Sequence, residues 1–172
     1  MLGFSQWLSQ TSLSLAIQIH LWIIPLVQCI HIVAFCVASI SVFMIALRVV
    51  GLAGSYMTLR QTLDRFMPPL FVALCIALAT GALMVVGEPT RDLMSFSFWM
   101  KMSLLAIATI TTLLFQMAAT RNETYWQEVA IQSWVTKSAA LLTILIWLGV
   151  IVMGRLIAYD SIWGALSKVP RD

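Results

Sequence analysis

Four long apolar stretches dominate the chain, and each is long enough to cross a lipid bilayer as a helix. The hydrocarbon core of a bilayer is about 30 Å thick and requires about 20 consecutive apolar residues in a helical span. The stretches run over residues 22–51, 68–87, 96–116 and 138–158. Backbone groups in lipid must bond within their own segment, which favours a helix for each stretch. The pattern predicts an all-α integral membrane four-helix bundle that forms one domain over residues 1–172.

Proline positions mark where two of the predicted spans begin. Pro25 suits the first turn of the first span, where a missing backbone N–H costs no hydrogen bond, and Pro68-Pro69 are predicted to open the second span. The first stretch exceeds the required length, so we expect it to tilt or to extend past the lipid. Gln28, His31 and two serines are the polar residues in it before its last turn.

The two ends of the chain are too polar to span a membrane. Residues 4–20 interleave large apolar side chains with serine and glutamine, which is typical of an amphipathic helix lying in the membrane interface. Residues 159–172 mix isoleucine, tryptophan and leucine with aspartate, lysine and arginine, and this tail is predicted to lie on the membrane surface.

Composition agrees with a protein whose main solvent is lipid. Hydrophobic residues make up 61% and charged residues 10% of the chain, against about 25% charged residues in soluble domains. The net charge of +3 is spread singly along the chain, without the basic cluster that nucleic acid requires. Cys29, Cys36 and Cys75 lie in apolar stretches, so we expect small buried thiols.

The distribution of Lys and Arg gives an orientation. Cytoplasmic loops carry an excess of these residues, and the first span usually decides. None precedes the first span, whereas Arg48, Arg60 and Arg65 follow on the far side. Lys168 and Arg171 in the tail favour the opposite orientation. Because the first span dominates, we expect both termini outside.

Polar residues inside a span are costly and mark candidate sites. At about 1.5 Å per residue, His31 lies about 13 Å and Thr80 about 10 Å below the N-terminal side of the bundle. Lys101, Trp147, Arg155 and Glu88 fall in the same half. Lys101 and Arg155 lie near helix ends, where their side chains can snorkel to the headgroups. Alternatively, they form a basic lining for an anionic headgroup, a quinone or an acidic partner.

His31 is a candidate ligand for haem b or copper. The chain has two histidines, His20 and His31, which are about 16 Å apart along one helix and therefore cannot hold the same iron. A His–Met haem, a haem shared between two chains, a haem completed by a partner subunit, or no haem remain open, and ten methionines make thioether ligands available. The plainer alternative is a neutral His31 hydrogen-bonded within the bundle, with Gln28 at i−3 as the nearest partner.

Several separated segments together resemble a family of small bacterial inner-membrane proteins that is known only as a domain of unknown function. The segments are Pro25 to His31, Leu47-Arg48 with Gly51, Thr80-Gly81, Phe98 with Lys101, and Trp147 with Gly154-Arg155 to Tyr159. The resemblance implies a four-helix multi-pass protein of the inner membrane, with His31 and Arg155 as the positions to watch, and it implies no activity. Gln28 and Ala46 stand where acidic residues are common in that family. Copper-resistance and b-type cytochrome membrane proteins are similar in architecture, but their multiple histidines are not matched.

No phosphate-binding glycine loop, paired intramembrane carboxylates or serine nucleophile motif occurs in the sequence. We therefore predict a non-enzymatic anchor or accessory subunit, in a periplasm-facing redox or metal-handling assembly, that contacts the bilayer and a protein partner or a second copy of itself. The alternative is a haem-b or copper electron carrier that uses His31. The candidate site residues are His31, Gln28, Thr80 and Arg155.

Overall fold

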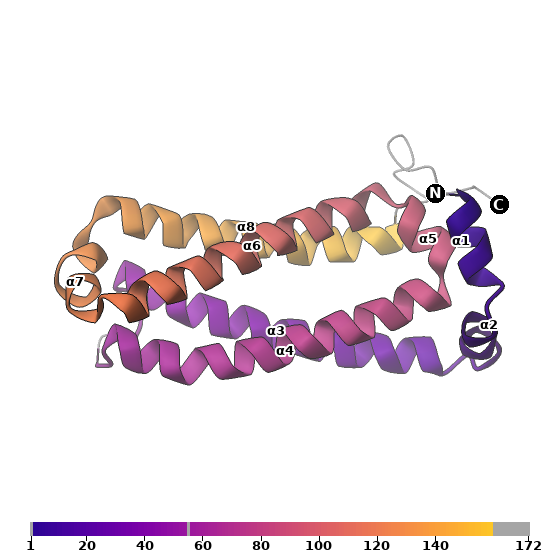
Figure 1. Ribbon diagram of the computed structural model, residues 1–172, viewed down its shortest axis with the longest axis horizontal. Coiled ribbons are helices and arrows are strands. Elements are labelled where there is room, and N and C mark those ends of the chain that lie inside the picture. Colours follow the sequence, from indigo (N-terminus) through magenta and orange to yellow (C-terminus); the bar gives the residue numbers. More distant parts are fainter. Residues whose placement is uncertain (1, 55, 160–172) are drawn as a thin grey trace.

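The protein is a bundle of four long apolar helices. The computed structural model describes residues 2–54 and 56–159, and within this part of the chain every regular element is helical (Figure 1). The long helices are α3 (Ile23–Val50), α4 (Leu59–Gly87), α6 (Phe96–Arg121) and α8 (Trp134–Leu156). Each is long and apolar enough to cross a membrane. The predicted all-α membrane bundle is confirmed, and the chain is a membrane-spanning helical protein.

The four spans form two antiparallel pairs. Figure 1 shows α3 beside α4 and α6 beside α8, and α3 also packs against α8. Small residues let the helices approach closely in the interior, since Ala38 of α3 and Ala108 of α6 are fully buried. Among the described residues, Trp147 of α8 is the largest fully buried side chain, with 1% of its surface exposed. The interior is therefore shaped by small side chains around one large aromatic ring.

Short helices gather at the N-terminal end of the bundle. α1 (Leu2–Ser9), α2 (Ser12–Ile19) and α5 (Pro89–Met94) lie together there, with α1 packed on α5 and α2 on α4 (Figure 1). The single interfacial helix expected over residues 4–20 is thus two helices. The break has a local cause, because the Thr11 hydroxyl accepts a hydrogen bond from the Ser14 N–H at 3.3 Å and starts a new helix.

Helical turns close the opposite end and follow the last span. α7 (Glu123–Glu128) and the 3₁₀ turn η1 (Ala130–Gln132) connect α6 to α8, and a second 3₁₀ turn, η2 (Ile157–Tyr159), follows α8. Apart from Tyr159, the surface tail expected over residues 159–172 lies outside the described residues.

α4 begins well before the prolines that were expected to open it. Thr58 and Gln61 form a capping box, in which the Thr58 hydroxyl accepts from the Gln61 N–H at 3.1 Å and the Gln61 side chain accepts from the Thr58 N–H at 2.9 Å. Pro68 and Pro69 therefore lie inside the helix. The carbonyls that they leave without an N–H partner belong to the exposed turn at Asp64, where water can bind them.

The cysteine prediction was wrong. Cys29, Cys36 and Cys75 are free thiols exposed on the outer surface of the bundle. In a soluble protein an apolar stretch buries such side chains, but lipid tails solvate the outside of a membrane bundle equally well. Apolarity alone therefore does not distinguish the inner face from the outer face of these helices.

Candidate functional site

Three polar side chains from three different spans meet in the interior of the bundle, in the half nearer the N-terminus. We call His31 of α3, Thr80 of α4 and Lys101 of α6 the polar cluster. His31 Nδ1 lies 2.8 Å from Thr80 Oγ1, and His31 Nε2 lies 3.3 Å from Lys101 Nζ. All three are buried, with 7–8% of their surface exposed. Their bonds tie α3 to α4 and α3 to α6.

The hydrogen bonds of Thr80 determine which nitrogen of His31 carries the proton. The Thr80 hydroxyl donates its single proton to the Ile76 carbonyl at 2.7 Å. Its oxygen must then accept from His31 Nδ1–H, because a hydroxyl has one proton and two lone pairs. This leaves the lone pair of His31 Nε2 pointing at Lys101, whose ammonium donates to it. The cluster is a directed chain from Lys101 through His31 to Thr80 and the α4 backbone.

The aromatic ring of Phe35 packs against both His31 and Lys101. The Phe35 ring, one turn along α3, lies 4.9 Å from the His31 ring and 6.3 Å from the Trp147 ring. Lys101 Nζ lies 4.7 Å from the centre of the Phe35 ring. A cation over an aromatic face is stabilised by the ring quadrupole. Phe35 thus compensates part of the cost of burying the Lys101 ammonium, in a region that lacks bulk water.

Two glycines lie directly against the long polar side chains of the cluster. A Cβ at Gly81 would lie 3.4 Å from His31 Cε1, and a Cβ at Gly154 of α8 would lie 3.5 Å from Lys101 Nζ. At these distances a methyl group would be in ordinary van der Waals contact with the imidazole or the lysine side chain, so both glycines lie directly against the polar cluster. The Thr80-Gly81 and Gly154 segments singled out in the sequence are therefore parts of one site.

A carboxyl group on α5, at the N-terminal end of the bundle, is close enough for its charge to act on Lys101. Burial raises the pKa of Asp92, on α5, from 3.8 to about 6. The positive charges of Arg91 and Lys101 act in the opposite direction, and the Glu88 carboxylate adds to the increase. Arg91 also forms an ion pair with Glu88. Asp92 is thus the acidic group whose charge acts on the buried lysine from outside the spans.

The structure joins some of the predicted site residues and separates others. His31 and Thr80 are bonded to each other, but Gln28, the partner expected for His31, is exposed on the outer surface. Arg155 is also exposed and outside the cluster. Lys101 was expected to snorkel and is instead buried against His31. Its place in the same membrane half as His31 was the available signal, whereas the contact between Lys101 and Gly154 could not be recognised without the fold.

The cluster as built does not fit a haem iron or a copper ion at His31. Both imidazole nitrogens already have partners within the chain, and a metal at Nε2 would take the position of a positively charged ammonium. Among the described residues no group of three His, Cys, Asp or Glu side chains could hold a metal ion. A ligand role for His31 would require Lys101 to move away.

The fold and the site together define a four-span helical membrane protein with a histidine–lysine pair buried in one half of the bundle. A family of unknown function, DUF6644, has a family model that matches residues 16–160. The chain belongs to this family. No curated protein and no solved structure matches the chain. The matched range contains all three members of the polar cluster.

Proposed function

We propose that this protein is a non-enzymatic accessory subunit of a redox assembly in the bacterial inner membrane, with both termini outside, and that its polar cluster holds one mobile proton near the outer surface. The observation that supports this most directly is the 3.3 Å approach of Lys101 Nζ to His31 Nε2 in a buried site. Two basic nitrogens at this distance repel each other when both are charged. This repulsion disfavours a doubly charged pair, and the proposal assigns the pair one positive charge.

The shared proton can move without a change in the backbone. When Lys101 donates a proton, an N–H bond breaks at Nζ and an N–H bond forms at His31 Nε2. The resulting imidazolium keeps its Nδ1–H bond to Thr80, and the neutral amine accepts from Nε2–H across the same distance. In the proposed orientation Asp92 is on the outer side of the pair, and its carboxyl, whose pKa is raised to about 6, is a group that can gain and lose protons there. Histidine and lysine together thus provide two positions for one proton.

An accessory role follows from how closed the site is. Both ring nitrogens of His31 lie within hydrogen-bond distance of Thr80 or Lys101, and Gly81 and Gly154 lie in contact with these side chains. A substrate would need a cavity beside the reactive groups. α1, α2 and α5 moreover lie over this end of the bundle (Figure 1). We infer that the cluster serves a protein partner rather than a substrate of its own.

The assembly is tested by purifying the tagged full chain in mild detergent and identifying stoichiometric partners. We expect a redox protein to copurify with the wild type and with Gln28→Ala, a control whose side chain lies on the outer surface of the same helix. Lys101→Met keeps the length of the side chain and removes its charge, and we expect it to lower the partner's turnover without releasing the chain. A chain that is monomeric and without a partner in every detergent would contradict the accessory role.

An optical spectrum and a metal analysis of the same preparations separate this proposal from the electron-carrier alternative. Because both His31 nitrogens are bonded within the chain, we expect the purified chain to be colourless and to hold no stoichiometric copper. A haem or copper signal in the wild type that disappears in His31→Ala would show that His31 is a ligand, and it would contradict the proposed proton-holding role. Gln28→Ala again serves as the control.

A further inference from the structure

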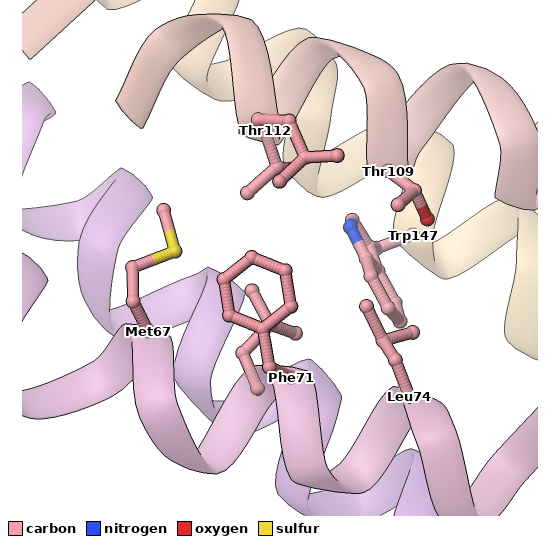
Figure 2. A pocket seen from close by; sticks show the side chains of 8 residues that line it. Met67, Phe71, Leu74, Thr109, Thr112 and Trp147 are labelled. Atoms are coloured by element: carbon pink, nitrogen blue, oxygen red, sulfur yellow. The ribbon is translucent and has the colours of Figure 1, made fainter. Parts of the chain in front are cut away.

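A narrow cleft, distinct from the polar cluster, lies where α4, α6 and α8 meet. Figure 2 shows the side chains that line it, among them Met67, Phe71 and Leu74 of α4, Thr109 and Thr112 of α6, and Trp147 of α8. Its free volume is about 10 Å³, and about 10–15 Å³ is enough for one water molecule. A ring or an acyl chain is too large for this cleft, so its ligand is of the size of water.

Trp147 has a buried donor on this cleft. The side chain is 1% exposed, and its Nε1–H has no hydrogen-bond partner within the part of the chain that the structure describes. In Figure 2 the indole nitrogen lies on the edge of the ring nearer α6. A buried indole N–H usually has an acceptor, because leaving it unbonded costs the free energy of its desolvation. The acceptor of Trp147 therefore has to lie in the cleft.

The Thr109 hydroxyl is a second polar group without a partner in the same cleft. Other threonines of α6 donate to the carbonyl one turn back, Thr111 to Ile107 at 2.8 Å and Thr112 to Ala108 at 2.7 Å. A threonine in a helix commonly bonds its own backbone in this way. Within the described residues, Thr109 makes no such bond. Its hydroxyl is thus available to a molecule between α6 and α8.

The cleft is too deep in the membrane for bulk water to supply these partners. Trp147 is nine residues before Leu156, the last residue of α8, which places it about 13 Å below the surface of a core about 30 Å thick. Lipid tails offer neither donors nor acceptors at this depth. The partner of the indole must be held by the protein itself.

We propose that this cleft binds one water molecule, which accepts a hydrogen bond from Trp147 Nε1–H and links it to the hydroxyls of Thr109 and Thr112. The proton of Thr112 is used on the Ala108 carbonyl, so its oxygen accepts from the water. The Thr109 hydroxyl can donate or accept. Three polar partners are usual for a buried water. The water thus forms the polar connection between α6 and α8 that the side chains do not make directly.

NMR of the full chain in detergent tests the water directly. We expect a cross-peak between Trp147 Nε1–H and the water frequency, with Overhauser effects of opposite sign in the laboratory and rotating frames, as for a water that tumbles with the protein. Contacts to the Phe35 ring, 6.3 Å from the Trp147 ring, assign the signal. Thr109→Val and Thr112→Val each remove one partner and are expected to weaken the cross-peak, and the double variant is expected to lose it.

A double-mutant cycle tests whether Trp147 and Thr109 share the water. We expect Thr109→Val to raise the unfolding equilibrium constant about fivefold in the wild type, because the water loses a partner, and less than about twofold in Trp147→Phe, where its donor is already gone. Thr111→Val is the matched control, since Thr111 is exposed and bonded to its own helix, and it is expected to change little in either background.

Three results would overturn the water site. The first is a Trp147 signal without a cross-peak to water in the wild type. The second is a cross-peak that one valine substitution abolishes and the other leaves unchanged, because it then comes from that hydroxyl. The third is an equal effect of Thr109→Val in both backgrounds of the cycle. His31→Ala is expected to keep the cross-peak, so failure of the water site and failure of the polar cluster's role are observed in different variants.

Discussion

At the scale of single residues, the polar cluster depends on the direction of each hydrogen bond in it. His31 has a donor nitrogen facing Thr80 and an acceptor nitrogen facing Lys101, and this direction is fixed by the bond from the Thr80 hydroxyl to the α4 backbone. The Thr80 hydroxyl oxygen on α4 thus selects the tautomer of His31 on α3. The same chain of hydrogen bonds directs the Lys101 ammonium toward His31 Nε2.

Replacing Thr80 tests this dependence. Thr80→Val keeps the shape and removes the oxygen, which leaves His31 Nδ1–H buried without an acceptor. We expect a loss of about 1 kcal/mol in the free energy of unfolding, since membrane hydrogen bonds average about 0.6 kcal/mol and a stranded donor costs more. The measurement is unfolding in mixed detergent micelles. Thr80→Ser should restore stability, and Thr111→Val, at an exposed position, should behave as the wild type. Equal losses in both valine variants would contradict the role of the cluster.

At the scale of elements, α5 is a short helix that places a carboxyl group against the end of the bundle. It begins at Pro89 and ends at Met94, and the next residue, Ser95, has a hydroxyl that accepts from the Phe98 N–H at 3.0 Å and starts α6. This tight connection holds Asp92 partly buried. The spans on either side are apolar, so the carboxyl has little water to stabilise its charge, and its pKa rises to about 6.

Asp92 therefore predicts a pH dependence of stability. The pKa of Asp92 is higher in the folded protein than its value of 3.8 in an unfolded chain. Its stabilising contribution is complete below pH 3.8 and is lost as the pH rises through about 6, because the folded protein then has to bury a charge. Lys101, Arg91 and Glu88 are the charged groups that act on it.

The Asp92→Asn variant isolates this contribution. We expect the wild type to lose stability between pH 4 and pH 6 relative to Asp92→Asn, which mimics the protonated carboxyl at every pH. Thermal unfolding in detergent at a series of pH values measures the difference. Asp64→Asn is the control, because Asp64 is an exposed partner of Arg60 near the other end of the bundle. Parallel curves for wild type and Asp92→Asn would show that Asp92 is not buried in the folded protein.

At the scale of the whole molecule, the alternation of four spans brings the polar cluster into the half of the bundle on which the short helices α1, α2 and α5 lie. α1, α2 and α5 lie at the end that also carries the C-terminus of α8, and α7 lies at the other (Figure 1). This places Gln10 on one side of the membrane and both Tyr56 and Asn122 on the other. The arrangement holds for either orientation, whereas the proposed orientation puts Gln10 outside.

Cysteine labelling tests the arrangement and the orientation together. We would replace the three native cysteines by alanine, which their exposed positions should tolerate, and introduce Gln10→Cys, Tyr56→Cys or Asn122→Cys singly. A membrane-impermeant maleimide is expected to label Gln10→Cys in intact spheroplasts, and to label the other two only after the membrane is opened. The reverse pattern would invert the proposed orientation, and labelling of all three from one side would contradict four spans.

α4 begins at Leu59, a boundary that the hydrophobic pattern of the sequence does not indicate. The residues from Leu59 to Met67 include Arg60, Asp64 and Arg65 and read as a loop, but the Thr58–Gln61 capping box starts the helix there. Charged residues are compatible with a helix that extends beyond the lipid. Local capping bonds therefore decided the element boundary, whereas the apolar run decided only the part inside the membrane.

The sequence by itself determined the four spans, their alternation and the membrane half that holds His31, Thr80 and Lys101, because lipid requires long apolar helices and each helix has a fixed rise per residue. Only the tertiary structure decided which side chains meet. Gln28 is three residues from His31 yet points outward, and Thr80 and Lys101 reach His31 from other helices. The apolar faces of a membrane helix look alike toward lipid and toward protein, so the rotation of each helix, and with it the site, follows from packing.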